Sequence, residues 1–369
     1  MSTSHADPPV PAMYRRTPDE LRAWWDRRDP EPALEPELPI IDAHHHLWDR
    51  ARERYLLEEF LEDANSGHRI VSSVYVEAGS MYRASGPAEE APLGEIEFAT
   101  GVAAMSASGR YGECRVAEGV VGRVDLTVGR AAGVLLDRAL HISSGRLKSI
   151  RHGLAWDPSP GISAVRKAGS SGTSSRFATE RLSESPAFRE GFAELAARGL
   201  AFDLFMFHPQ LGEAVELARS FPETTIVVNH AGGPLGVGRY ATGISESRSV
   251  WRDALVRLAA EPNVVMKIGG LGMPLFGFGM EEREVPPTSE QLAAAWSATV
   301  DTCIEAFGSN RCMFESNLPP DGQSGRYVTI WNAYKRITSL ASASEKADLY
   351  HGTAARTYDL VRPTTPQHA

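Results

Sequence analysis

Three adjacent histidines, His44, His45 and His46, lie within the stretch "IIDAHHHLWD". In a β-strand residues i and i+2 face the same side, so His44 and His46 are expected to point together while His45 points away. Two imidazoles side by side make half of a metal site, in which nitrogens lie about 2.0–2.1 Å from a zinc ion. Asp42 shares their face one step deeper, where it either orients them by hydrogen bonding or fills a layer of the interior.

Eight apolar, β-branched runs recur along the chain, and each is followed by a segment with the spacing of an amphipathic helix. The predicted strands comprise residues 38–46, 69–79, 119–127, 147–156, 200–207, 224–233, 263–272 and 310–320. The predicted helices comprise residues 54–66, 95–109, 130–141, 185–199, 209–222, 249–262, 289–308 and 325–340. Several of the helices open with Ser or Pro and close with Gly or Pro, which are start and stop signals.

This alternation predicts an α/β protein whose parallel sheet closes into a (β/α)8 TIM barrel. A doubly wound open sheet is the main alternative, but it would carry a Gly-rich phosphate loop after the first strand, where this chain has histidines. The chain has 369 residues, of which 42% are hydrophobic, and this is enough for one such barrel. We expect an N-terminal arm over residues 1–37 with a short helix, a single catalytic barrel over residues 38–362 and a tail over residues 363–369.

The formal net charge is −9, and no basic run of five residues occurs. Nucleic acid is therefore not expected as a partner, because phosphate contacts need a basic face. Three cysteines without a C-x-x-C pair fit a reducing compartment. We find no apolar signal segment and no run of 18 apolar residues, so we expect a cytoplasmic protein without membrane contact. Homo-oligomerisation is left open.

Polar side chains mark the carboxyl ends of the predicted strands, where a TIM barrel has its active site. A polar group in a buried barrel mouth is costly without a ligand, a metal or a partner. Any one of these histidines would fit a structural role, but four of the eight strand ends carry histidine, from eleven histidines in the chain, and this clustering indicates an active site. In strand order these residues are His44 to His46, Glu77, Asp125, Arg151 with His152, His208, His230, Lys267, and Glu315 with Asn317.

Three basic residues are candidates for binding an acidic substrate, because Arg suits bidentate contacts with carboxylates. They are Arg151 on strand four, next to His152, Arg83 in "SMYRASGP", and Lys267 on strand seven. The alternative for each is a salt bridge on the surface or between strands. Glu77 is expected at the site as a ligand, as a partner of a histidine or as the counter-ion of Arg151.

The stretches "IDAHHHLWD", "VVGRVDL", "IRHGLAWD", "NHAGGP" and "RCMFESNLPP" resemble the metal-dependent hydrolases of the amidohydrolase superfamily, in particular the amidohydrolase-2 group with its lactonases. The resemblance covers residues 38–360 and implies a distorted TIM barrel. It implies metal binding by His44 and His46, with His208 at a position where many members bind metal and His230 matching the strand-six histidine. Zinc is the first expectation and manganese the alternative. Some lactonases of this group work without metal, with histidines or arginines holding the substrate.

The chain departs from the pattern of this group at strand eight, where members commonly carry an aspartate that acts as general base. Here the position holds Asn317, and an amide cannot accept a proton near neutral pH. Three substitutes stay open: Glu315 from one layer down, Asp321 folding back from the loop, or a histidine.

These observations predict a hydrolase that opens a small carboxylated lactone, or a related ester or amide ring, by attack of water. The expected partner is a small organic acid. His230 is expected as the acid–base or orienting group and Arg151 as the carboxylate ligand. The alternatives are a decarboxylase or a hydratase/lyase on the same scaffold, which the missing aspartate favours, and a catalytically silent binding barrel.

Overall fold

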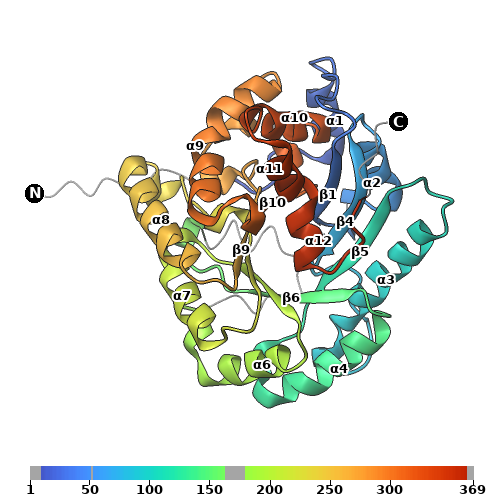
Figure 1. Ribbon diagram of the computed structural model, residues 1–369, viewed down its shortest axis with the longest axis vertical. Coiled ribbons are helices and arrows are strands. Elements are labelled where there is room, and N and C mark those ends of the chain that lie inside the picture. Colours follow the sequence, from blue (N-terminus) through green and yellow to red (C-terminus); the bar gives the residue numbers. More distant parts are fainter. Residues whose placement is uncertain (1–9, 51–52, 163–178, 364–369) are drawn as a thin grey trace, which may run out of the picture.

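The computed structural model describes residues 10–50, 53–162 and 179–363, and these residues form the predicted barrel (Figure 1). Eight strands pair in parallel in the order β1-β4-β5-β6-β7-β8-β9-β10. The strands are β1 (Pro39–His45), β4 (Arg69–Val76), β5 (Arg115–Gly122), β6 (Leu147–Gly153), β7 (Ala201–Phe205), β8 (Ile226–Val228), β9 (Val264–Ile268) and β10 (Cys312–Phe314). All eight predicted strands are confirmed, and each of them ends one to six residues earlier than predicted, where the chain turns into a loop.

The barrel closes where the segment after β10 meets the end of β1. The amide of Asn317 donates to the carbonyl of His44 at 2.9 Å, and the amide of His46 donates to the carbonyl of Leu318 at 2.8 Å. A parallel bridge also joins His45 and Leu318. The backbone of the histidine stretch therefore forms the seam between the first and the last strand.

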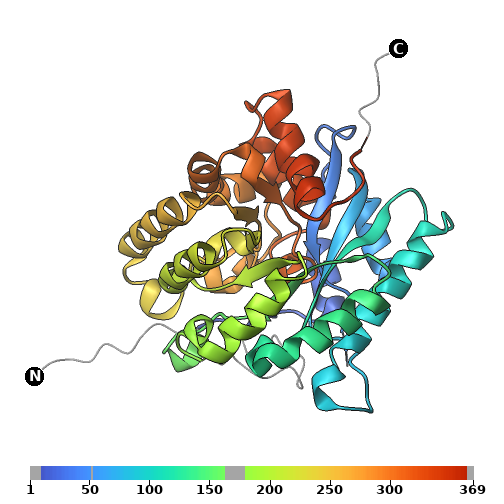
Figure 2. The same ribbon diagram turned by 60° about the horizontal axis from the view of Figure 1, so that its bottom comes forward.

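Helices surround the strands on the outside, as Figures 1 and 2 show. The eight predicted helices correspond to observed helices, and the short helix of the N-terminal arm is also present. A small antiparallel pair, β2 (Trp48–Arg50) with β3 (Glu53–Tyr55), was not predicted. The helices are α1 (Pro18–Trp25), α2 (Leu57–Ala64), α3 (Leu93–Ala107), α4 (Ala132–Ile142), α6 (Pro186–Ala196), α7 (Leu211–Ser220), α8 (Ile244–Ala259), α9 (Ser289–Phe307), α10 (Tyr327–Ile337), α11 (Ala343–Ala347) and α12 (Thr353–Thr357).

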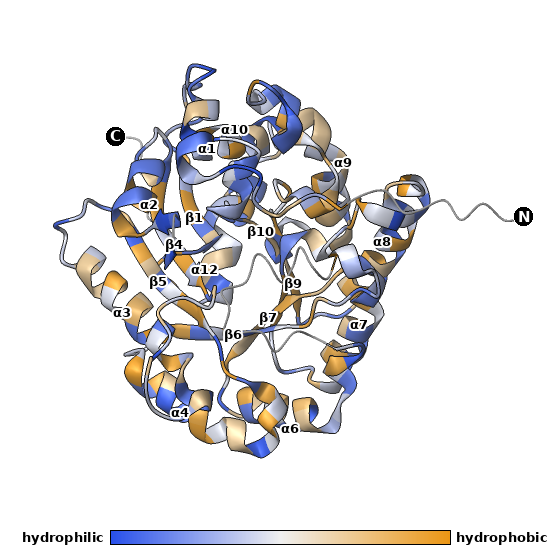
Figure 3. Ribbon diagram, turned by 180° about the vertical axis from the view of Figure 1, so that it is seen from behind, coloured by the Kyte–Doolittle hydropathy of each residue, from blue (hydrophilic) through white to orange (hydrophobic). Residues whose placement is uncertain are grey.

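Two apolar cores follow from the alternation of side chains along the strands. The larger core lies between the barrel and the helices. The smaller core packs inward-facing strand residues against α12 and the residues that follow it, among them Tyr358. In Figure 3 the strands carry apolar colours along much of their length, whereas the helices alternate apolar and polar colours. The C-terminal helix therefore contributes to the filling of the barrel interior.

One ion pair is fully buried inside the barrel. Lys267 on β9 donates to Asp203 on β7 at 2.7 Å, and both side chains are without solvent exposure. The hydroxyl of Tyr358 donates to both carboxylate oxygens at 3.0 and 2.9 Å, and the amide of Asn229 donates to one of them at 2.9 Å. Each donor thus offsets part of the cost of burying the Asp203 charge.

Helix α1 of the N-terminal arm packs against loops of the barrel. Trp24 donates from its indole nitrogen to the carbonyl of Arg283 at 2.9 Å, and Trp25 donates to the carbonyl of Gly322 at 3.1 Å. Residues 1–9 of the predicted arm and residues 364–369 of the predicted tail lie outside the described residues. In the part of the chain that the structure describes, no helix combines the length and the apolar character that crossing a membrane requires.

We predict that Lys267→Met lowers the free energy of unfolding by roughly 3–5 kcal/mol, because it leaves the Asp203 carboxylate buried without its cation. Denaturation in urea, followed by circular dichroism, measures the change. Lys148→Met is the matched control, since Lys148 pairs at 3.4 Å with Asp359, whose side chain is 98% exposed. The control should stay within about 1 kcal/mol of the parent. Equal stability of the Lys267→Met variant and the parent would contradict the assignment.

Candidate active site

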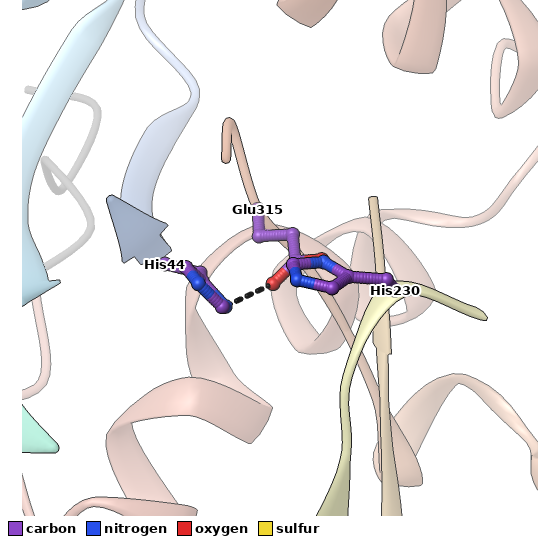
Figure 4. A group of neighbouring side chains, drawn as sticks. All are labelled: His44, His230 and Glu315. Carbon is purple, nitrogen blue, oxygen red and sulfur yellow. Dashed lines mark hydrogen bonds and ion pairs between the residues drawn. The ribbon is translucent and has the colours of Figure 1, made fainter. Parts of the chain in front are cut away.

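Three side chains from distant parts of the chain converge at the carboxyl ends of the strands (Figure 4). His44 comes from β1, His230 follows β8 and Glu315 follows β10. His230 Nδ1 lies 2.6 Å from Glu315 Oε1, and His44 Nδ1 lies 2.9 Å from Glu315 Oε2. Glu315 is without solvent exposure, so one buried carboxylate holds the rings of two histidines.

Two of the three histidine rings are held by a hydrogen bond at Nδ1, whereas Nδ1 of His44 lies 2.9 Å from Glu315 Oε2 without a hydrogen-bond geometry. His46 Nδ1 donates to the carbonyl of Val76 at 2.7 Å, as His44 Nδ1 and His230 Nδ1 face Glu315. The Nε2 atoms of His44 and His46 face each other and lie only 3.2 Å apart. The rings of His44 and His230 are 4.7 Å apart between centroids, which makes the three histidines one cluster.

The donor set fits a divalent cation. Metal-binding histidines generally donate their second nitrogen to a carboxylate or a backbone carbonyl, as His46 and His230 do. Two nitrogens 3.2 Å apart, each about 2.05 Å from a zinc ion, subtend an angle of about 100°, close to tetrahedral. Ligand atoms of His44, His230 and Glu315 also lie within 4.8 Å of one another. A cation shared by His230 Nδ1 and Glu315 Oε1 is less favourable, because atoms 2.6 Å apart would subtend only about 80° at an ion about 2.05 Å from each, well below the tetrahedral angle.

The two nitrogens that face each other belong to neutral rings. Burial lowers the pKa of His44 well below its ordinary value, and the positive charges of Lys267 and Arg151 act in the same direction. Burial, followed by the charge of Arg151, likewise lowers the pKa of His46. Nδ1 of His46 donates to a carbonyl, so the lone pair of that neutral ring is on Nε2, whereas Nε2 of His44 lies within hydrogen-bond distance of Arg151.

Arg151 and Glu77 form an ion pair beside the histidines. Arg151 Nε donates to Glu77 Oε1 at 2.8 Å, and a second guanidinium nitrogen donates to the carbonyl of Glu77. The third nitrogen lies 3.4 Å from His44 Nε2. Burial would raise the pKa of Glu77, but the charges of Arg151 and Arg123 outweigh it and lower that pKa. Glu77 is therefore an ionised counter-ion of Arg151, one of the three roles considered from the sequence.

The backbone around the cluster is strained where it turns the site residues inward. His230 has φ of 54° and Asn317 has φ of 50°, both in the left-handed region that side chains other than glycine avoid. Such conformations cost about 1–3 kcal/mol each and gather at functional sites. A Cβ atom on Gly270 would lie 2.6 Å from His230 Nδ1, so glycine is needed there for the close approach of the ring.

Asp42 connects β1 to the loop that follows β10 through hydrogen bonds. It accepts from the amides of Ser316 at 2.9 Å and His44 at 3.3 Å, and from the hydroxyl of Tyr327 at 3.1 Å. Burial raises the pKa of Asp42 to about 6, and these donors oppose the shift. Asp42 therefore orients the backbone of the histidine stretch rather than an imidazole ring.

Asn317 and Asp321 are bonded to each other. The amide of Asn317 donates to Asp321 Oδ1 at 2.7 Å, and the amide of Gly272 donates to Asp321 Oδ2 at 3.0 Å. Among the described residues of β10 and the loop that follows it, only Glu315 has hydrogen bonds or ion pairs with the histidine rings. Of the three substitutes for the missing aspartate, Asp321 is engaged elsewhere, whereas Glu315 and a histidine, His230, lie in the cluster and contact each other.

The structure does not bring His208 into the cluster. Its Nδ1 accepts from the amide of Leu235 at 3.2 Å, and its Nε2 lies 3.1 Å from the hydroxyl of Ser247. Both ring nitrogens are thus engaged beyond β7, where the chain turns into a short 3-10 helix. Placing His208 among the metal ligands is therefore not supported by the geometry.

Two basic residues proposed for substrate binding also have other partners. Arg83 pairs with Glu97 and, at 3.3 Å, with Glu90, at the outer side of the loop after β4. Lys267 is inside the barrel on Asp203, without solvent exposure. Both residues thus follow the alternative considered from the sequence, which is a salt bridge within the chain, and for Lys267 it joins two strands.

The remaining histidines of the strand ends face away from the cluster. His45 stacks on Phe60 of α2, with ring centroids 4.1 Å apart, and lies 2.9 Å from the hydroxyl of Ser73. His152 accepts weakly from the amide of Leu126 at 3.5 Å and packs edge-on against Phe188 of α6. Both side chains point toward the helix layer, as the alternation along a strand requires.

Sequence inspection missed two contributors near the site. Asp203 holds Lys267, and its position in the middle of an apolar strand was the available signal. Arg123, directly after β5, comes close enough to Glu77 to lower its pKa. The available signal was its place at the end of a predicted strand, in "VVGRVDL", where the sequence analysis names only Asp125.

Comparison with known proteins places this geometry in context. Residues 41–360 match the profile of the family described as amidohydrolase. The chain is 32% identical to "Uncharacterized protein y4mH" of Sinorhizobium fredii, over 87% of this chain and 99% of that protein. It is 31% identical to an L-fucono-1,5-lactonase of Burkholderia multivorans, over 48% of this chain and 57% of that protein.

The fold has a solved counterpart. The crystal structure of an amidohydrolase from Burkholderia multivorans with bound zinc aligns over 87% of this chain and 99% of that chain, with a TM-score of 0.64 and 24% identity. This likeness extends the agreement in fold to almost the whole of that protein.

We predict that His208 stabilises the fold only above mildly acidic pH. Burial lowers its folded pKa to about 4, against 6.5 for the free side chain. Its contribution is complete above pH 6.5 and is lost as the pH falls toward 4, because the unfolded chain binds the proton first. The stability difference between the parent and His208→Gln should shrink by about 1 kcal/mol from pH 7 to pH 5.5. Urea denaturation at both pH values tests this, and a constant difference would contradict it.

Proposed function

Because this chain belongs to the amidohydrolase family, we propose that it is a hydrolase that opens a small carboxylated lactone, or a related cyclic ester or amide, by attack of water. The observation that carries the proposal is the buried Glu315, which is hydrogen-bonded to Nδ1 of His230 and lies 2.9 Å from Nδ1 of His44. It leaves Nε2 of both rings, with that of His46, for chemistry at the carboxyl ends of the strands.

Two similarities support this reaction class. One relative is named L-fucono-1,5-lactonase, an enzyme that acts on a sugar lactone. The solved amidohydrolase with a similar fold holds zinc, and the histidine cluster of this chain fits such an ion. A zinc or manganese ion held by Nε2 of His44 and His46 would polarise the ring carbonyl and acidify the attacking water.

His230 is the acid–base group of the proposed reaction. Its Nδ1–H donates to Glu315, which fixes the tautomer with a lone pair on Nε2. Nε2 takes a proton from the water as its oxygen attacks the carbonyl carbon, and it returns the proton to the ring oxygen as the carbon–oxygen bond breaks. Glu315 stabilises the imidazolium between these two steps.

Arg151 supplies positive charge on the substrate side. Two of its guanidinium nitrogens are held by Glu77, and the third faces the histidines. That nitrogen would donate to the carbonyl oxygen or to a carboxylate of the bound ring, where negative charge develops. The Glu77 pair keeps the guanidinium in place without substrate.

One observation favours a second candidate, decarboxylation or another non-hydrolytic reaction on the same scaffold. Asn317 replaces the expected aspartate and donates to Asp321. Each carboxylate among the described residues of β10 and the loop that follows it therefore already contacts another side chain of the protein. Product analysis separates the candidates, because hydrolysis adds one water to the substrate whereas decarboxylation releases carbon dioxide. A silent binding barrel would show ligand binding without either product.

We predict that Glu315→Gln lowers kcat by roughly 10²-fold or more, because it removes the charge that stabilises protonated His230. The assay screens aldono-1,5-lactones, including L-fucono-1,5-lactone, and carboxylated unsaturated lactones for ring opening. Glu58→Gln on α2 is the matched control, since that side chain is 59% exposed, and it should retain the parent rate.

Asn317→Asp adds a test of the same carboxylate. The new charge would face Asp321 across the 2.7 Å of the present hydrogen bond, so we expect lower stability and no gain in rate. The role of Glu315 would be refuted if Asn317→Asp were faster than the parent and Glu315→Gln were fully active. These two results together would place the base after β10 at position 317.

We predict that protein purified without chelators contains about one zinc or manganese ion per chain, bound by the histidine cluster. His46→Ala should lower the metal content at least tenfold and abolish turnover, with the circular dichroism spectrum unchanged. His45→Gln is the control, because His45 faces Phe60 and should leave the metal content intact. Full activity of the parent after complete metal removal would contradict metal assistance and leave polarisation to Arg151.

A further inference from the structure

A cavity of about 670 Å³ lies between the loop after β4 and the segment that leads from β5 into α4. Ligand sites typically occupy about 300–1,000 Å³, so the cavity can hold a small molecule. One wall is apolar and consists of Val128, Ala131, Val134 and Leu135. Val134 is 58% exposed, so the fold by itself leaves this apolar surface to water.

Arg123 lines the cavity and is only 9% exposed. Its guanidinium has neither a hydrogen-bond partner nor an ion-pair partner within residues 10–50, 53–162 and 179–363. Arg138, in the same lining, is in contrast paired with Glu90. No nitrogen of Arg123 is fully buried without a partner, so its donors remain accessible from the cavity, where a ligand can supply the acceptors.

The acidic groups of the lining do not take up these donors. Glu90 is held by Arg83 and Arg138, and Glu89 is exposed. Asp125 accepts from the amide and the hydroxyl of Thr127.

Arg123 stays charged in this setting. Burial by itself would lower its pKa, but nearby negative groups, Glu77 first, outweigh burial and raise that pKa. Glu77 is held by Arg151. A permanent cation with unused donors thus faces a cavity with an apolar wall.

We infer that Arg123 and this cavity bind a small aliphatic carboxylate. The guanidinium holds the carboxylate through two parallel hydrogen bonds, and the aliphatic chain lies along Val128, Ala131 and Leu135. The cavity shares no lining residue with the histidine cluster, and the inference does not depend on the reaction proposed above.

Isothermal titration of the full-length protein with hexanoate tests the inference. We expect saturable binding of hexanoate, at least tenfold weaker binding of hexanamide, which lacks the charge, and weaker binding of acetate, which lacks the chain. Arg123→Gln should weaken hexanoate binding at least tenfold. Arg130→Gln is the matched control, because the Arg130 side chain is 82% exposed outside the cavity, and its affinity should equal that of the parent.

Ala131→Trp keeps the test decisive if Arg123→Gln fails to fold. Ala131 is exposed on the cavity wall, so the indole fills the cavity without entering the core, and hexanoate binding should be lost. The inference is overturned if the parent does not bind hexanoate, or if Ala131→Trp binds it as well as the parent does. Binding that survives Arg123→Gln but is lost in Arg151→Gln would also overturn it, by assigning the ligand to the histidine cluster.

Discussion

Glu315 has no exposed surface and yet carries a carboxylate, and the surrounding residues are arranged to meet that cost. A charge buried without compensation would destabilise the fold by several kcal/mol. His44 and His230 supply nitrogens on the two sides of the carboxylate. The space for it depends on Gly269, where a Cβ atom would lie 2.2 Å from Glu315 Cγ. The orientation of the rings, and with it the chemistry available at Nε2, follows from this one buried group.

The barrel separates the charges that it buries into layers. Arg151 pairs with Glu77 beside the histidines, whereas Lys267 pairs with Asp203 in contact with Tyr358 from the C-terminal end of the chain. The remaining carboxylate of the cluster, Glu315, has histidines instead of a permanent cation as its partners.

The sequence predicts the barrel well because its signal is periodic. Eight β-branched runs, each followed by an amphipathic segment, specify the strand order, and the two-residue period of a strand places His44 and His46 on one face. It offers Glu77 as the counter-ion of Arg151 among three roles, but it does not pair Lys267 with Asp203. Lys267 and Asp203 are 64 residues apart, and only the closed barrel brings their strands close enough. The sequence around His208 does not predict that its ring contacts Ser247, because that contact depends on how the loop after β7 turns. In the same way, the sequence around Trp24 does not predict its hydrogen bond to the Arg283 carbonyl.

The seam of the barrel has a consequence for how the protein acquires activity. Asp42, on the first strand, and Ser316, which follows the last, bind each other across a separation of 274 residues in the chain. Contacts of such long range form late, because the entropy of closing a large loop must be overcome first. His44 and His46 are made early in translation and His230 later, but none of the three can adopt the geometry described here until the last strand has been synthesised and has docked. A nascent or partly folded chain would hold these metal-binding side chains without a structure that positions them, so assembly of the active site and completion of the barrel are one event.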